Sequence, residues 1–247
     1  MNSTHRVALI SDLHANAIAL RAVLRAIEAE GVDEIICLGD VATLGVGPCE
    51  VVDVLQSLGC RCINGNHDDY VLRDTPPDGH NDTPIIKDSI QWAREQLSQN
   101  QLEFVSRFEV GIDLMLGQHH RIKLFHGSPS SNLVNLLAET PAEEFDALLG
   151  PERATIMAGG HTHLPMLRQH RGVLVVNPGS VGAPFREYPS GGPPVILPVA
   201  QYACIEARNE RLSVQLHQVP LDRKALLQAA TASDNPLAPS LKAVGHI

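Results

Sequence analysis

The amino-acid sequence predicts an α/β fold, and two observations lead to this class. Short apolar runs that end in a polar or glycine-containing turn recur through the first 65 residues, and helical patterns follow two of them. Parallel strands buried on both faces have continuous apolar sequences, and they need helical crossovers to pair. A chain of 247 residues, 44% of them hydrophobic, can bury the core of one large domain, with or without an insertion.

The first three predicted strands alternate with two helices. Residues 6–11 form the first apolar run, and apolar residues then recur at helical spacing from 20 to 27. Residues 34–39 and 48–59 repeat this strand and helix order, with a proline suited to the first helical position. Residues 60–65 supply the third strand. Repeats of this kind build a parallel sheet with helices on its faces.

The pattern changes after Tyr70. Residues 73–84 are typical of a loop and residues 85–108 of two consecutive helices, so we expect a helical insertion at about 71–109. Strands return at 111–116, 121–127 and 154–160, in a hairpin at 165–180 and in a pair at 201–207 and 211–218, with helices expected at about 130–149.

The remaining segments complete the predicted domain. Residues 183–200 form an excursion rich in proline and glycine between two strands. We expect a single domain over residues 1–235 and a loose C-terminal tail over 236–247.

Composition narrows the possible partners and the expected location. The 28 acidic and 19 basic residues give a net charge of −9, which opposes non-specific binding to nucleic acids or anionic membranes. We therefore expect neither kind of partner. The five scattered cysteines suit a reducing compartment, and we expect Cys60 and Cys62 to be packing residues. The N-terminus does not resemble a signal peptide and no apolar run could span a bilayer, so we predict a cytoplasmic protein.

Polar side chains follow five of the predicted strands, and most have glycine beside them. They are Asp12 and His14, Asp40, Asn66 and His67, His126, and finally His161 and His163. In open α/β sheets such strand ends converge on one rim, where ligands bind. Carboxylate, amide and imidazole groups without thiolates suit divalent manganese, iron, zinc or nickel.

The number of these side chains predicts a pair of metal ions. Two Asp, one Asn and four or five His supply at least seven ligands, which are too many for one tetrahedral ion but suit two ions that share a bridging ligand. Two divalent cations, two carboxylates and one bridging hydroxide leave a net charge of about +1, which attracts an anion. Such a pair can activate the bridging hydroxide for in-line attack on a phosphate ester. The sequence therefore favours phosphoester hydrolysis.

Five motifs in one order resemble the calcineurin-like metallophosphoesterase superfamily. They are "SDLHAN" at 11–16, "GDVATLG" at 39–45, "GNHD" at 65–68, "HG" at 126–127 and "GHTH" at 160–163. The opening motif and "VVNPGSVG" at 175–182 are similar to its small bacterial phosphodiesterase and phosphatase branch. The resemblance covers roughly residues 6–217 and implies a double β-sandwich of mixed sheets flanked by helices, rather than purely parallel sheets.

The resemblance also implies roles for the individual residues. Asp12, His14 and His163 would hold a first metal, Asn66, His126 and His161 a second, and Asp40 would bridge the two. His67 would not bind metal. It would contact the phosphate and assist the leaving group, which makes it and Asp40 the expected catalytic residues.

Three carboxylates in these motifs have structural alternatives. An isolated Asp12 or Asp40 after a strand would be interpreted as a helix cap, but the joint pattern favours metal binding. For Asp68 we favour a helix cap or support of a metal-bound histidine over coordination.

Asn16 and Arg186 are the candidate substrate-binding residues. Asn16 lies near the phosphate by resemblance, although local hydrogen bonds to a helical backbone are an equal alternative. Arg186 could bind phosphate oxygens bidentately, but arginines in loops are usually solvated. Asn177 begins "NPGS" and suits a turn as well as support of the site.

Two classes of function remain. The first is an enzyme acting on a small phosphate ester or nucleotide, with protein phosphatase and dinucleotide polyphosphate hydrolase as variants. The second is a non-catalytic metal-binding scaffold or interaction module on the same fold. The complete ligand set favours the enzyme, because a scaffold has no need for seven convergent ligands and His67. The oligomeric state is not predicted.

Overall fold

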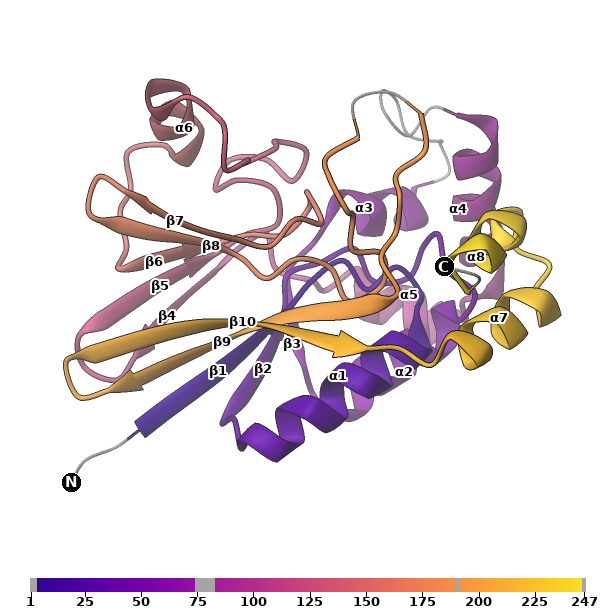
Figure 1. Cartoon of the computed structure of the whole chain (residues 1–247), viewed down its shortest axis with the longest axis horizontal. Helices are drawn as coiled ribbons and strands as arrows, with labels where there is room; N and C mark the ends of the chain where they lie inside the picture. Colours follow the sequence, from indigo (N-terminus) through magenta and orange to yellow (C-terminus); the bar gives the residue numbers. More distant parts are fainter. Residues whose placement is uncertain (1–3, 74–82, 190–191, 246–247) are drawn as a thin grey trace.

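The computed structural model describes residues 4–73, 83–189 and 192–245 of the chain. Two five-stranded sheets pack face to face, and helices cover their outer faces (Figure 1). This arrangement is the predicted double sandwich.

The first sheet combines parallel and antiparallel strands. Its order is β10 (Arg211–Pro220), β9 (Val199–Arg208), β1 (Thr4–Ile10), β2 (Glu34–Cys37) and β3 (Arg61–Cys62). The strands β1, β2 and β3 are parallel, as the alternating pattern predicts, whereas β9 pairs antiparallel with both β1 and β10.

The second sheet is also mixed. Its order is β4 (Ile112–Leu116), β5 (His120–Leu124), β6 (Ile156–Ala158), β8 (Val173–Asn177) and β7 (Met166–His170). Strands β5, β6 and β8 are parallel, and the edge strands β4 and β7 are antiparallel to their neighbours.

Eight helices are present in the described residues. They are α1 (Ala17–Glu30), α2 (Pro48–Ser57), α3 (Asn66–Leu72), α4 (Pro84–Gln96), α5 (Gln99–Val105), α6 (Ala142–Leu149), α7 (Arg223–Ala232) and α8 (Ala238–Gly245).

The central strands are buried on both faces, which explains their continuous apolar sequences. Leu9 of β1 belongs to the core between the sheets, whereas its neighbours Ala8 and Ile10 pack in the core that includes α1 and α2. A third core lies between the second sheet and α6, where Phe145 is fully buried. With both faces covered, the polar groups of the chain gather at the strand ends.

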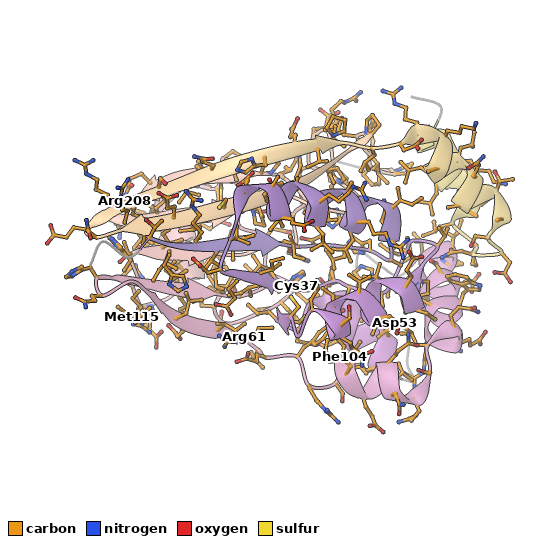
Figure 2. The ribbon with its side chains drawn as sticks, turned by 90° about the horizontal axis from the view of Figure 1, so that it is seen from below. Cys37, Asp53, Arg61, Phe104, Met115 and Arg208 are labelled. Carbon is orange, nitrogen blue, oxygen red and sulfur yellow. The ribbon has the colours of Figure 1, made fainter. Side chains whose placement is uncertain are left out.

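The inserted helices are attached to α2. The Gln101 amide of α5 donates hydrogen bonds to Asp53 and to the Cys49 carbonyl oxygen of α2. Figure 2 shows Asp53 and Phe104 on these neighbouring helices, at the other end of the molecule from Arg208 and Met115.

One expectation outside the sheets needs correction. Helix is present only at Ala142–Leu149 within the segment 130–149, because Ser128 and Ser131 exchange backbone hydrogen bonds that start a series of turns. Within the described part of the C-terminal segment, α8 is present and Ala238 at its start is only 3% exposed, while the looseness of residues 236–247 stays a prediction.

Candidate metal centre

The predicted ligands meet at the carboxyl ends of the strands. They follow β1, β2, β3, β5 and β6, and the structure brings their side chains into two groups. The first cluster is Asp12, His14 and His163, and the second is Asp40, His126 and His161. Within each cluster, one potential ligand atom from every residue lies within 4.8 Å of the others.

The first cluster is a buried pocket of facing ligand atoms. The Nε2 atoms of His14 and His163 are 3.0 Å apart, and His163 Nε2 is 3.4 Å from Asp12 Oδ1. Asp12 Oδ1 is buried without a hydrogen-bond partner among the described residues and faces His163 Nε2. An unsatisfied buried carboxylate oxygen is costly, so this donor set fits a bound cation.

The second cluster includes the predicted asparagine. His126 Nε2 lies 3.2 Å from Asn66 Oδ1 and 3.5 Å from Asp40 Oδ1. His126 Nδ1 donates a 2.7 Å hydrogen bond to the Leu38 carbonyl oxygen, which leaves Nε2 free to bind a metal.

Asp40 faces both clusters with different oxygen atoms. Its Oδ1 is the atom near His126, and its Oδ2 lies 3.8 Å from His14 Nε2. The carboxylate is 1% exposed. One buried carboxylate between two groups of imidazoles is the arrangement expected of a bridging ligand.

The backbone at these ligands is held in a rarely occupied conformation. Positive φ angles occur at five ligands: Asp12 (53°), His14 (42°), Asp40 (58°), His161 (67°) and His163 (58°). Such backbone costs about 1–3 kcal/mol per residue and concentrates at functional sites. The rest of the fold must therefore offset this cost in free energy of folding in order to hold these side chains in their orientations.

Glycines allow the strand-end loops to approach one another. A Cβ atom at Gly65 would overlap Oδ1 of Asp40, and one at Gly160 would overlap the Ser11 hydroxyl and approach Asp12 Oδ2. The glycines of "GNHD" and "GHTH" are therefore required by packing against the ligands.

Asp68 holds the loop that carries Asp40. Its Oδ2 accepts hydrogen bonds from the backbone N–H groups of Asp40 and Gly65, and its Oδ1 accepts one from Val41. Asp68 thus caps α3, as one interpretation expects, and it holds the loop of Asp40 rather than a metal-bound histidine. Burial and the charge of Asp40 raise the pKa of Asp68 to about 7.

The segment 177–182 secures the first cluster. Asn177 donates to the Gly160 carbonyl oxygen and to the Thr162 hydroxyl, and it accepts from Gly179 N–H, so it serves both as a turn and as support. The Ser180 hydroxyl donates a 2.7 Å hydrogen bond to the Asp12 carbonyl oxygen. Sequence reasoning missed Ser180, although "NPGSVG" follows a buried strand as the ligand motifs do.

His67 lies beside the clusters and has a hydrogen-bond partner of its own. Its Nδ1 is 2.9 Å from the Thr43 hydroxyl oxygen, and its ring stands edge-on to His14, with 5.1 Å between ring centroids. The ring is close to the ligands without belonging to either group.

The candidate substrate residues have local partners. Asn16 caps α1 by accepting a hydrogen bond from Ala19 N–H, and its Nδ2 donates to the Gly182 carbonyl oxygen. Arg186 is 59% exposed at its side chain and pairs with Glu187. The contacts of Asn16 are the local hydrogen bonds that were its alternative role, and Arg186 is largely exposed to solvent. A substrate contact by either residue stays a prediction.

The charged side chains of the two clusters shift one another's pKa values. Burial raises the pKa of Asp12, but the charge of the neighbouring His163 lowers it by more, and the resulting pKa is about 2. Burial lowers the pKa of His126, but Asp40 raises it to about 10. Burial and His163 lower the pKa of His14 to about 3. The carboxylates are therefore charged and need positive partners.

Comparison with known proteins identifies the family. The chain belongs to the calcineurin-like phosphoesterase superfamily, whose domain model matches residues 6–194. The predicted resemblance is therefore confirmed. Membership supports a hydrolase kind of activity, and the two Asp and His clusters fit the divalent metals that such proteins bind.

Individual relatives agree with this family and fold. An uncharacterized protein of Methanocaldococcus jannaschii is 28% identical over 195 residues, which are 72% of this chain and 76% of that protein. A metallophosphoesterase from Sphaerobacter thermophilus superposes with a TM-score of 0.71 at 24% identity, covering 98% of this chain and 100% of that chain. A hypothetical protein from Pyrococcus horikoshii gives a TM-score of 0.80 at 21% identity, covering 97% and 96%.

The helices were also compared with the length and apolarity of membrane spans. Among the described residues, none of the helices is long and apolar enough to cross a lipid bilayer.

Proposed function

We propose that this protein is a dinuclear-metal-dependent phosphoesterase that hydrolyses phosphodiester or phosphomonoester bonds in a small phosphate ester or nucleotide. The observation that carries the proposal is Asp40, whose two carboxylate oxygens face different clusters of ligands. A buried carboxylate shared in this way supports two ions acting on one substrate.

The proposal assigns six ligands to one ion each and shares the seventh. Asp12, His14 and His163 would hold the first ion, Asn66, His126 and His161 would hold the second, and Asp40 would serve both. The oxygen and nitrogen donors suit manganese, iron, zinc or nickel. Bound ions of this kind activate water and neutralise charge on phosphoryl oxygens.

The residues of the chain supply the remaining chemistry. His67 stands next to the ligands without being one, so it can donate a proton to the leaving group or a hydrogen bond to the phosphate. All of these ligands except His161 are buried, and charge interactions are stronger at buried sites than in water.

A non-catalytic scaffold is the alternative in a different class. His67 beside the ligand set and the five candidate ligands with positive φ favour the enzyme, because a scaffold would gain little from a donor next to the metals or from this strain. Within enzymes, activity on phosphoproteins or dinucleotide polyphosphates is an outcome of the substrate test.

Metal content and hydrolysis test the proposal together. Protein reconstituted with manganese, nickel, zinc or magnesium should bind close to two ions of the preferred metal per chain by elemental analysis. The same samples should then hydrolyse members of a panel of phosphomonoesters, phosphodiesters and pyrophosphates. If the protein bound one ion or none per chain with each of the four metals, the dinuclear centre would be contradicted. If it bound two ions but hydrolysed no substrate, the scaffold would be favoured.

A further inference from the structure

Thr43 has an unusual position for a residue outside the ligand set. It lies in the loop between β2 and α2, three residues after Asp40, and is 0% exposed. Among the described residues, His67 Nδ1 is the only hydrogen-bond partner of the Thr43 hydroxyl group, at 2.9 Å.

The burial of Thr43 decides which group donates. If His67 Nδ1–H donated to Thr43, the hydroxyl hydrogen would have no acceptor and no access to water. Such an unsatisfied donor costs about 1–3 kcal/mol. If the Thr43 hydroxyl donates instead, His67 Nδ1 is the acceptor and the proton of a neutral ring is on Nε2. Thr43 therefore selects the Nε2–H tautomer of His67.

The turn that carries Thr43 is held from two sides. Gly45 N–H donates to the Thr43 carbonyl oxygen at 2.9 Å, and a Cβ atom at Gly45 would overlap the His14 carbonyl oxygen. From the other side, Asn235 Nδ2 donates a 2.7 Å hydrogen bond to the Gly45 carbonyl oxygen. Asn235 is 2% exposed, so this contact excludes water.

The contact comes from the C-terminal segment, which lies outside the family match at residues 6–194. Trp92 of the inserted helix α4 donates to Asp234, beside Asn235, and so fixes the same segment between α7 and α8. In Figure 1 these two yellow helices lie next to α4, at the helical end of the molecule.

We propose that Thr43 is a positioning residue that fixes the tautomer of His67, and that Asn235 of the C-terminal segment holds the Thr43 turn in place. The proposal rests on the proposed function for its kinetic consequence, in which the Nε2–H group of the neutral ring donates a hydrogen bond to the phosphate or to the leaving oxygen, most effectively where that oxygen is most basic. The tautomer itself is a property of the folded chain and can be measured without any activity.

The first experiment measures that tautomer. Long-range ¹H–¹⁵N spectra of the full chain, metal-free and loaded with zinc, distinguish protonated from unprotonated ring nitrogens. Wild type and Thr43→Ser should both show His67 with a proton on Nε2. Thr43→Val, which keeps the shape and removes the hydroxyl group, should shift His67 toward the other tautomer. Thr231→Val, a matched change on the exposed side of α7, should leave His67 unchanged.

The second experiment measures metal content and rate across a leaving-group series. Thr43→Val should keep the wild-type metal content and lose about 10- to 100-fold in kcat on esters of poor leaving groups, the range typical of residues that support a site. It should lose less on nitrophenyl esters, and Thr43→Ser should recover most of the rate. Asn235→Ala should show the same trend with a smaller loss.

The outcomes separate this inference from the proposed function. A wild-type His67 protonated on Nδ1, or a Thr43→Val spectrum identical to wild type, overturns the role of Thr43, whether or not the enzyme is active. Loss of metal in Thr43→Val also overturns it, since Thr43 would then support the ligands. If Asn235→Ala leaves both the spectrum and the leaving-group trend unchanged, the role of Asn235 is wrong. Absence of all hydrolysis in wild type contradicts the proposed function and leaves the tautomer result to decide Thr43.

Discussion

The two clusters differ in what supports them. His126 in the second cluster has a fully buried side chain, and its Nδ1 is held by the carbonyl oxygen of Leu38, at the end of a core strand. His163 in the first cluster is 7% exposed at its side chain, and its Nδ1 is held by the carbonyl oxygen of Ala183. Ala183 begins the proline-rich excursion, which leaves the core of the fold.

The excursion contributes a second contact to the first cluster. The Phe185 ring stacks on His163 at 4.2 Å between centroids, with 25° between the ring planes. Phe185 pairs with Ile196 in an isolated bridge between the two arms of the excursion. At His126 the second cluster is supported by the sheet core, although its His161 is less buried than any ligand of the first cluster. At His163 the first cluster is supported partly by a surface segment, and on this difference we expect the first ion to be held less firmly.

Replacing Asp40 tests the feature that the clusters share. Asp40→Ala should lose both ions and reduce kcat by about 10⁴-fold or more, because one carboxylate supplies charge to each site. Elemental analysis and hydrolysis rates measure this. Asp113→Ala removes an exposed, ion-paired carboxylate and is the matched control. Wild-type metal content and rate in Asp40→Ala would refute the bridging role.

Replacing His67 tests the chemistry that lies between the clusters. His67→Asn should keep both ions and lose about 10²–10⁴-fold in rate on esters with poor leaving groups. Nitrophenyl esters should lose less, because their leaving group needs no proton. Metal content and a leaving-group series decide the matter. Loss of one ion would make His67 a ligand, and an equal loss for every ester would limit it to orienting the phosphate.

Graded chelation compares the clusters directly. The ion of the first cluster should leave first, with a dissociation constant about 10- to 100-fold higher, because partners outside the ligand set affect affinity by that factor. Anomalous diffraction from crystals soaked in increasing concentrations of chelator measures the occupancy of each cluster. If both clusters lost their ions at the same chelator concentration, or the second cluster lost its ion first, support by the core or by the surface segment would not determine metal affinity.

Phe185 offers the smallest expected effect and the sharpest test of the surface support. Phe185→Ala should weaken binding at the first cluster by about threefold to tenfold, since a stacked ring pair contributes about 0.5–1.5 kcal/mol. The second cluster should keep its affinity. Titration of the two ions in Phe185→Ala and in Phe185→Tyr, which keeps the stack, measures this difference. Equal weakening of both clusters would mean that Phe185 stabilises the fold as a whole.

The sequence alone determined where the ligands lie and why they converge. Asp12, Asp40, Asn66 and His126 each follow an apolar run, and the pattern of buried strands predicts that such ends meet at one rim. Roles for single residues came from the ordered motifs rather than from spacing. The helical interpretation of residues 130–149 was wrong over most of its length. Serine side chains and prolines favour turns over helix in this segment, although its overall composition is compatible with a helix.

Only the tertiary structure decided the partners that are distant in the sequence. The antiparallel pairing of β9 with β1 joins residues about 200 positions apart, and strand pattern does not specify such a neighbour. In the same way, the hydrogen bonds that Asp68 accepts from the Asp40 loop and the one that Asn235 donates to Gly45 depend on where loops meet in space. A local sequence pattern records which face of an element is buried. The groups that support a site depend on how elements pack against one another. No short stretch of sequence specifies that packing, because it depends on residues throughout the chain.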